Sequence, residues 1–212
     1  MKVLILNPNT TKAMTDSVLA VLKRKAPSSL EMVGMTATSG CAVIDSPQTC
    51  AIGAQTAMQM LAEAPSDFAL VVLACFGDVG LSELRASSKV PVISLAQTAF
   101  DYVMNQKTKA AVITIGEQWG PRLYDYLARL QVPADLIDIH TLPGNGKKLI
   151  EDPQGFRHRV LEQSKIAAEH GARLLFLGGA AFADMKFEVD PRLTLVDTLD
   201  LIALELTRMQ EH

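Results

Sequence analysis

Short apolar runs alternate with longer amphipathic stretches along the chain. The runs rich in Val, Ile and Leu are typical of buried parallel strands and predict strands at residues 3–6, 31–35, 68–74, 91–95, 110–115, 136–140 and 173–177. Apolar residues at helical spacing predict helices at residues 11–25, 47–64, 80–87, 98–106, 121–130, 152–170 and 199–210. This alternation predicts an α/β fold with parallel sheets.

The segment that ends the third predicted strand, Leu73-Ala74-Cys75-Phe76-Gly77, has a counterpart in Phe176-Leu177-Gly178-Gly179-Ala180. Each segment follows an apolar run, and we interpret the pair as two similar halves. The predicted architecture is therefore two pseudo-symmetric Rossmann-like lobes with an interlobe cleft. We expect residues 1–96 and 195–212 in the first lobe and residues 97–194 in the second. Ligands of such sheets bind at the carboxyl ends of strands, here the loops after Leu6, Ala74, Thr114 and Leu177.

Composition narrows the class of protein. The 212 residues are 49% apolar and 20% charged with a net charge of −3, which is ordinary for a globular protein and leaves no basic footprint for nucleic acid. The longest apolar stretch, residues 68–76, is much shorter than the ~18 residues of a membrane span. The three cysteines lack metal spacing and are interpreted as free thiols in a reducing compartment. We expect a cytoplasmic protein with a small-molecule substrate and no nucleic-acid or membrane partner.

Cys75 is the first candidate for chemistry. It lies where a predicted central strand ends and a glycine-containing turn leads into a helix. Backbone N–H groups and the helix dipole at such a position stabilise a thiolate and lower the pKa of the thiol from ~8.5, which makes the cysteine a usable base or nucleophile. A small buried thiol is the alternative, and packing is the expected role of Cys41 and Cys50.

Polar residues at other strand ends are candidates for ligand binding. Asn7, Asn9 and Thr10 lie between the first strand and the first helix, where they offer amides and hydroxyls to an anionic or imide-like ligand. Helix capping explains the threonine as well. Thr114 ends another strand and could donate to a ligand carbonyl, although its β propensity is a sufficient reason for its place. Asp78 either caps the next helix or acts near Cys75.

Two other patterns do not meet the requirements of the sites that they suggest. Residues 143–147 look like a phosphate loop, but a phosphate loop needs Gly at Thr141 and Ser or Thr at Lys148, so we predict a surface turn. The four histidines lack the i, i+4 spacing of a helical zinc pair, and no cysteine is near them in the sequence. No metal site is predicted.

Several motifs, in this order, resemble the hydantoin racemase branch of the aspartate/glutamate racemase superfamily. They are Leu6-Asn7-Pro8-Asn9-Thr10-Thr11 with Met14-Thr15, Ala74-Cys75-Phe76-Gly77-Asp78 with Gly80-Leu81, Pro91-Val92-Ile93, Val112-Ile113-Thr114, and His170-Gly171-Ala172-Arg173 before Leu177-Gly178. The resemblance spans nearly the whole chain. It implies an isomerase without cofactor or metal, in which one cysteine from each lobe faces the stereogenic carbon of the substrate.

The resemblance also implies roles for individual residues. Cys75 would be the thiolate base, and hydrogen-bond donors would stabilise the developing enolate. The implied substrate-binding residues are Asn7, Asn9, Thr10, Phe76, Gly77, Asp78, Thr114, Gly178 and Ala180. The implied substrate carries carboxylate or imide groups, as in a hydantoin, allantoin or an amino acid. By analogy with the family, a homo-oligomer is also an expectation.

The second motif departs from the family. Where the family has Leu-Gly-Cys-Ala-Gly, this chain has Leu177-Gly178-Gly179-Ala180-Ala181, and Gln97 stands where an acidic residue is usual. Gly179 thus occupies the place of the second catalytic cysteine and has no proton to give, so a two-thiol racemisation cannot run unchanged. Four interpretations stay open. The first is an epimerase in which Cys75 forms the carbanion and water, Asp184 or another group reprotonates it. The second is a decarboxylase or isomerase that needs a single cysteine. The third is an engineered replacement of the second cysteine, and the fourth is a catalytically silent binding protein.

Overall fold

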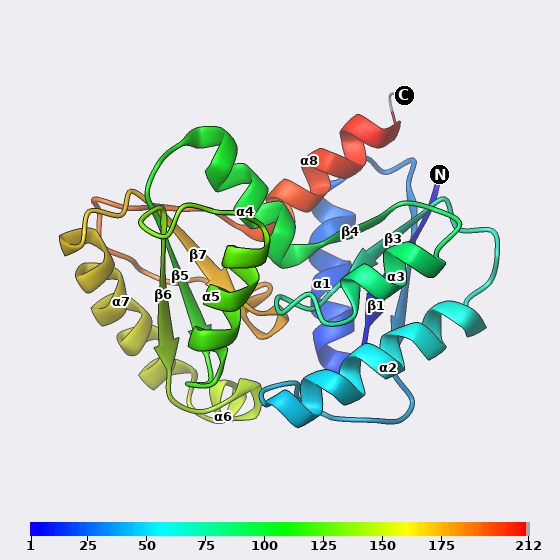
Figure 1. Ribbon diagram of the computed structural model, residues 1–212, viewed down its shortest axis with the longest axis horizontal. Coiled ribbons are helices and arrows are strands. Elements are labelled where there is room, and N and C mark those ends of the chain that lie inside the picture. Colours follow the sequence, from blue (N-terminus) through cyan, green and yellow to red (C-terminus); the bar gives the residue numbers. More distant parts are fainter. Residues whose placement is uncertain (211–212) are drawn as a thin grey trace.

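The computed structural model contains two four-stranded parallel sheets (Figure 1). It describes residues 1–210 apart from the side chains of residues 147 and 150. The first sheet has the order β2-β1-β3-β4 and contains β1 (Lys2–Asn7), β2 (Glu31–Thr36), β3 (Leu70–Leu73) and β4 (Val92–Ser94). The second has the order β6-β5-β7-β8 and contains β5 (Ala110–Ile115), β6 (Ile137–Leu142), β7 (Leu174–Gly178) and β8 (Thr194–Leu195). The two orders match when β5 is placed on β1, which confirms the predicted α/β fold with two similar halves.

Helices cover the faces of both sheets, as the continuous apolar strands require. They are α1 (Lys12–Lys25), α2 (Pro47–Glu63), α3 (Leu81–Ser87), α4 (Leu95–Gln106), α5 (Trp119–Arg129), α6 (Gly146–Glu151), α7 (Pro153–Glu169), α8 (Thr198–Gln210) and the 3-10 turn η1 (Ala180–Phe182). Every residue of β3 and of β5 is buried. Within residues 1–210, no helix is both long and apolar enough to cross a membrane.

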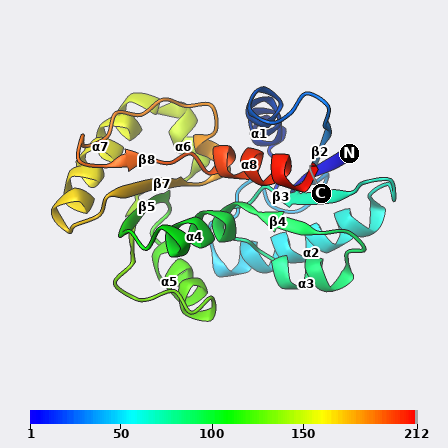
Figure 2. The same cartoon turned by 90° about the horizontal axis from the view of Figure 1, so that it is seen from above.

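Helices α4 and α8 join the two halves. Helix α4 follows β4 of the first sheet, α8 follows β8 of the second, and the two helices pack against each other (Figure 2). Helix α8 also packs against α1, so the end of the chain returns to the first half. One buried apolar cluster extends from the first sheet to Val112 and Phe176 of the second. Because this core is shared, the lobe boundaries at residues 96 and 195 stay a prediction.

Three short elements lie outside the sequence prediction. Helix α6 begins at Gly146, inside the segment predicted as a surface turn, and the side chain of Asn145 caps it by accepting from the Lys148 N–H at 3.2 Å. Strand β8 has two exposed residues, and η1 is a single turn. Elements of this length hold too few residues to show a hydrophobic period, so the sequence gives no signal for them.

Candidate active site

Cys75 and Gly179 follow corresponding strands of the two sheets, β3 and β7. The last residue pair between β1 and β3 is Leu6–Leu73, and the last pair between β5 and β7 is Thr114–Gly178. Cys75 thus lies two residues beyond the paired part of β3, and Gly179 lies one residue beyond that of β7, each at the carboxyl end of its strand. The fold therefore brings both positions to the edge where parallel sheets bind ligands.

A cavity of about 90 Å³ lies between these two strand ends. Eight of the predicted site residues line it, namely Asn9, Cys75, Phe76, Gly77, Thr114, Gly178, Gly179 and Ala180. The lining also includes residues that the sequence analysis did not select, among them Met14, Trp119, Gly146 and Phe182. Apart from Cys75, no described residue of the lining has an ionisable side chain. The cavity thus offers one titratable group and apolar or amide surroundings.

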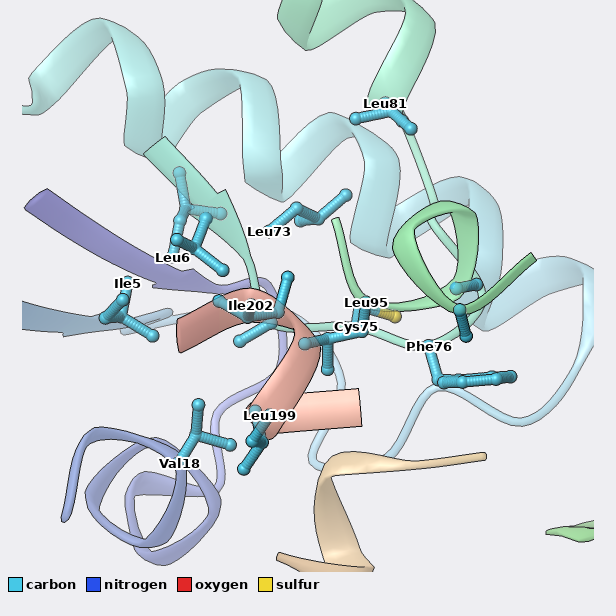
Figure 3. Packing of buried hydrophobic residues seen from close by; sticks show 14 of the residues in the cluster. Ile5, Leu6, Val18, Leu73, Cys75, Phe76, Leu81, Leu95, Leu199 and Ile202 are labelled. Atoms are coloured by element: carbon cyan, nitrogen blue, oxygen red, sulfur yellow. The ribbon is translucent and has the colours of Figure 1, made fainter. Parts of the chain in front are cut away.

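Cys75 is a protonated thiol in this cavity. Cys75 is 9% exposed and belongs to the buried apolar cluster that the two halves share (Figure 3). The pKa of the thiol is raised to about 12, mainly because burial disfavours the thiolate. Hydrogen bonds from the Gly77 and Val79 backbone N–H groups oppose this shift, and the nearby Asp78 carboxylate adds to it. The expected lowering of this pKa is therefore wrong, because the two N–H groups do not outweigh the loss of solvation.

Asn9 is the polar side chain best placed to meet a ligand. Its Oδ1 accepts from the Thr11 N–H at 2.9 Å and from Asn7 Nδ2 at 3.1 Å, which fixes the orientation of the amide. Its Nδ2 has a weak partner, the sulfur of Met14 at 3.6 Å. A stronger acceptor on a ligand in the cavity can replace that sulfur.

Asn7 and Thr10 do not line the cavity. Asn7 is 1% exposed, and its Nδ2 donates to Asn9 and to Thr15 Oγ1 at 2.9 Å, so it supports Asn9 from behind. The backbone N–H of Thr10 donates to the carbonyl of Cys41 at 2.9 Å and anchors the loop. The sequence indicated that both residues lie near the end of the first strand but did not reveal that Asn9 alone of the three lines the cavity.

Thr114 lines the cavity with its donor already used. Its hydroxyl donates to the carbonyl of Gly178 at 2.6 Å and so ties the end of β5 to the end of β7. A ligand carbonyl therefore competes with this bond for the hydroxyl hydrogen. The hydroxyl oxygen still has a lone pair with which it can accept a hydrogen bond.

Asp78 also stays outside the cavity lining. Its Oδ2 accepts from Ser94 Oγ at 2.8 Å, from the Gln97 N–H at 2.8 Å and from Tyr126 OH at 2.9 Å. Burial raises the pKa of this carboxyl group to about 6, and the hydrogen bonds oppose the shift. Asp78 thus fixes the turn after Cys75 to the start of α4 and to α5, and its oxygens are not free for a substrate.

A second cavity, of about 220 Å³, adjoins the first. Phe76, Gly179, Ala180 and Phe182 line both cavities. The remaining wall combines apolar side chains, such as Val18 and Val21 of α1 and Leu199 of α8, with five charged residues, namely Arg24, Lys25, Asp184, Lys186 and Asp197. Asp184 lies in this larger cavity and forms an ion pair with Arg24. It does not line the cavity at Cys75, and the structure gives no support to its role as the reprotonating acid.

Two glycines allow the halves to approach each other beside Cys75. A Cβ at Gly77 would lie 2.1 Å from Cη2 of Trp119 in the second half. A Cβ at Gly178 would lie 2.7 Å from Cε1 of Phe76 in the first half. Each aromatic ring therefore packs on a backbone that must be free of a side chain.

Gly77→Ala is expected to lower the free energy of unfolding by about 1–3 kcal/mol, because the Trp119 ring must move away from the new methyl group. Thermal unfolding measures this effect. Gly120→Ala is the matched control, since its Cβ would meet nothing closer than Cγ2 of Thr141 at 3.4 Å, an ordinary contact on a helix. Equal melting temperatures for the two variants would contradict the proposed packing.

Comparison with known proteins finds relatives that match most of the chain. Hydantoin racemase from Rhizobium meliloti is 30% identical over 195 residues, which cover 87% of this chain and 78% of the relative. The fold is similar to that of allantoin racemase from Pseudomonas fluorescens, with a TM-score of 0.90 at 22% identity over 99% of this chain and 92% of the other. Allantoin racemase from Klebsiella pneumoniae has a TM-score of 0.85 at 22% identity, covering 100% of this chain and 88% of the other. The family model described as Asp/Glu/Hydantoin racemase matches residues 3–206, and the chain therefore belongs to this family.

Proposed function

We propose that this protein is a cofactor-independent enzyme that transfers a proton at a carbon next to a carbonyl, in an uncharged cyclic ureide of the hydantoin or allantoin type. The observation that carries the proposal is the composition of the cavity, in which Cys75 is the one ionisable side chain among the described lining residues. A free amino acid would bring an ammonium and a carboxylate into this space without a counter-charge from these residues, which is costly. A neutral imide ring avoids that cost.

Cys75 has the role of the base in this proposal. The thiolate takes the hydrogen from the stereogenic carbon, the C–H electron pair moves into the adjacent carbonyl, and Asn9 Nδ2 donates to the oxygen that becomes negative. The thiol exchanges this hydrogen with solvent, and the same sulfur then returns a solvent-derived proton to the carbon. Because Gly179, which lines the same cavity, holds no proton, we expect return on the original face, which gives exchange with solvent but little inversion.

The larger cavity gives the substituent on the reacting carbon a place to extend. It adjoins the Cys75 cavity along a wall that includes Gly179, which has no side chain to separate the two spaces. The apolar part of its wall, which includes Val18, Val21 and Leu199, favours an aliphatic or aromatic substituent through burial of its surface. We expect substrates with such substituents to be preferred.

The catalysed exchange is expected to accelerate with pH. Since the pKa of Cys75 is raised to about 12, the thiolate is a minor species near neutral pH and its population rises about tenfold per pH unit below that pKa. The logarithm of kcat/KM for exchange should therefore rise with a slope of about +1 between roughly pH 6 and 9. The rate without protein is subtracted at each pH. A plateau reached near pH 7 would indicate an acidic thiol and contradict the role of burial.

A single-cysteine decarboxylase is the second candidate, and the protonation state of Cys75 favours it. Such an enzyme needs a thiol that gives a proton to the enediolate left after loss of carbon dioxide, and a thiol with a pKa of about 12 is in that form. Against it stands the cavity lining, where no described residue carries a positive charge for a substrate carboxylate. This difference in charge separates the two candidates.

Proton NMR in heavy water tests both candidates on one panel. It comprises hydantoins with small and large substituents, allantoin, aspartate, glutamate and arylmalonates. Loss of the α-proton signal from hydantoins or allantoin, with aspartate and glutamate unchanged, is the expected result. Release of carbon dioxide from arylmalonates alone would establish the decarboxylase. If no compound changes and some bind, the chain is a catalytically silent binding protein and the proposal is wrong.

A further inference from the structure

We propose that Asp138, His140 and His170 form a binding site for Zn²⁺ or a similar late first-row divalent metal. Asp138 and His140 are two residues apart on β6, the edge strand of the second sheet, and His170 caps the carboxyl end of α7. One ligand atom from each residue lies within 4.8 Å of the other two. To reach a common ion at the ~2.0–2.2 Å of zinc bonds, the three ligand atoms would move closer together by side-chain rotation.

His140 is oriented as a metal ligand. Its Nδ1 lies 3.1 Å from Oε1 of Gln163, and because an amide oxygen only accepts, Nδ1 carries the hydrogen and Nε2 holds the free lone pair. Nε2 is buried and has no hydrogen-bond partner among the described residues. Metal-ligating histidines commonly donate their second N–H in this way, which fixes the ring and its tautomer. A metal ion would satisfy the buried nitrogen.

Asp138 provides an oxygen with unused capacity. Its Oδ2 is buried and accepts no hydrogen bond from the described residues, although it forms an ion pair with Lys109 Nζ at 3.0 Å. Lys109 also donates to the backbone carbonyl of His170 at 3.0 Å. The lysine ammonium thus stands beside the cluster and links the same two elements that a metal would link. We infer that it competes with the metal for Asp138.

The donor set defines the class of metal. Two imidazoles and one carboxylate are typical ligands of Zn²⁺ and of neighbouring transition metals, whereas Mg²⁺ and Ca²⁺ prefer oxygen ligands throughout. His170 is exposed, so the fourth position is open to water and to metal entering from solvent. None of the three ligands lines the cavity at Cys75. The site therefore stabilises the junction of β6 and α7, and it is independent of the proposed reaction.

Zinc titration of the full chain after treatment with a chelator tests the proposal. Equilibrium dialysis should give one Zn²⁺ per chain, and saturating Zn²⁺ should raise the midpoint of thermal unfolding by about 3–8 °C. His140→Gln and the exposed His170→Ala should each weaken binding at least about tenfold. His158→Ala is the matched control, an exposed histidine on α7 outside the cluster, and it should bind as the wild type does.

Lys109→Met supplies a readout in the opposite direction. Removal of the competing ammonium should tighten Zn²⁺ binding by about threefold or more, with unfolding in the presence of chelator used to check that the variant folds. The proposal is overturned if zinc binding is absent, if it survives in both His140→Gln and His170→Ala, or if Lys109→Met leaves it unchanged. Binding that survives in these histidine variants but is lost in Cys75→Ser would assign the zinc to a thiol instead.

Discussion

Cys75→Ser is expected to reduce the catalysed exchange of the substrate α-proton by about 10²- to 10⁴-fold, the range that one positioned acid or base contributes. No other described residue of the cavity lining can take the proton, so no neighbour can replace the thiol. The serine hydroxyl can still accept from the Gly77 and Val79 N–H groups that now face the sulfur, and we expect the fold to be kept. Proton NMR in heavy water measures the exchange, and circular dichroism checks the fold.

Cys50→Ser is the matched control for this experiment. Cys50 is also a buried free thiol, and burial raises its pKa as well, but it lies on α2 and does not line the cavity. Its replacement should leave exchange within about twofold of the wild type. Equal losses in the two variants would point to a general effect of a buried hydroxyl and would remove the support for Cys75 as the base.

Gly179→Cys is expected to add inversion to exchange. A Cβ at this position would lie 3.7 Å from Cδ2 and 3.9 Å from Cε2 of Phe182, which are ordinary contacts, and the residue lines the same cavity as Cys75. A second thiol there would place a proton donor across the substrate from the first. We expect the rate of inversion of an enantiopure hydantoin to rise about 10²-fold, measured by optical rotation.

Backbone conformation sets the cost of this variant. Gly179 has a φ of 155°, which side-chain-bearing residues rarely adopt, so we expect a loss of about 1–3 kcal/mol in the free energy of unfolding. Gly179→Ala carries the same strain without a proton donor and is the matched control. Equal inversion rates in Gly179→Cys and Gly179→Ala would contradict this explanation. They would show that the wild type does not invert slowly for want of a proton donor at position 179.

The core strands could be predicted because burial on both faces leaves a continuous apolar run. This is why β3 and β5 were found with bounds within two residues of those observed. The short elements α6 and β8 could not be predicted, since β8 is exposed and neither has enough residues for a period to appear. The pseudo-symmetry could be inferred from the repeated motif at Cys75 and Gly179, because equivalent strand ends need similar turns.

Properties of the site that depend on distant residues were beyond the sequence. The pKa of Cys75 is set by packing from both halves, and local helix geometry suggested the wrong direction. The donors to Asp78 come from the start of α4 and from α5, so the sequence could not show that Asp78 supports the turn after Cys75.

The cluster at His140 and His170 joins a strand to a helix end, and a search for helical spacing misses such a pair. Side chains alternate between the two faces of a strand, so the spacing of Asp138 and His140 on β6 places them on one face. This spacing was the signal in the sequence that could have indicated the cluster.

The exchange and inversion rates of one enantiopure hydantoin, followed in the same sample in heavy water, show whether Cys75 moves the proton on one face of the substrate alone. NMR gives the incorporation of deuterium at the stereogenic carbon, optical rotation gives inversion, and the Cys75→Ser protein supplies the background. We expect deuterium to enter at least about tenfold faster than rotation is lost, because a single thiol serves one face. Loss of rotation in step with deuterium incorporation would contradict it, since that result requires a second proton donor opposite Cys75.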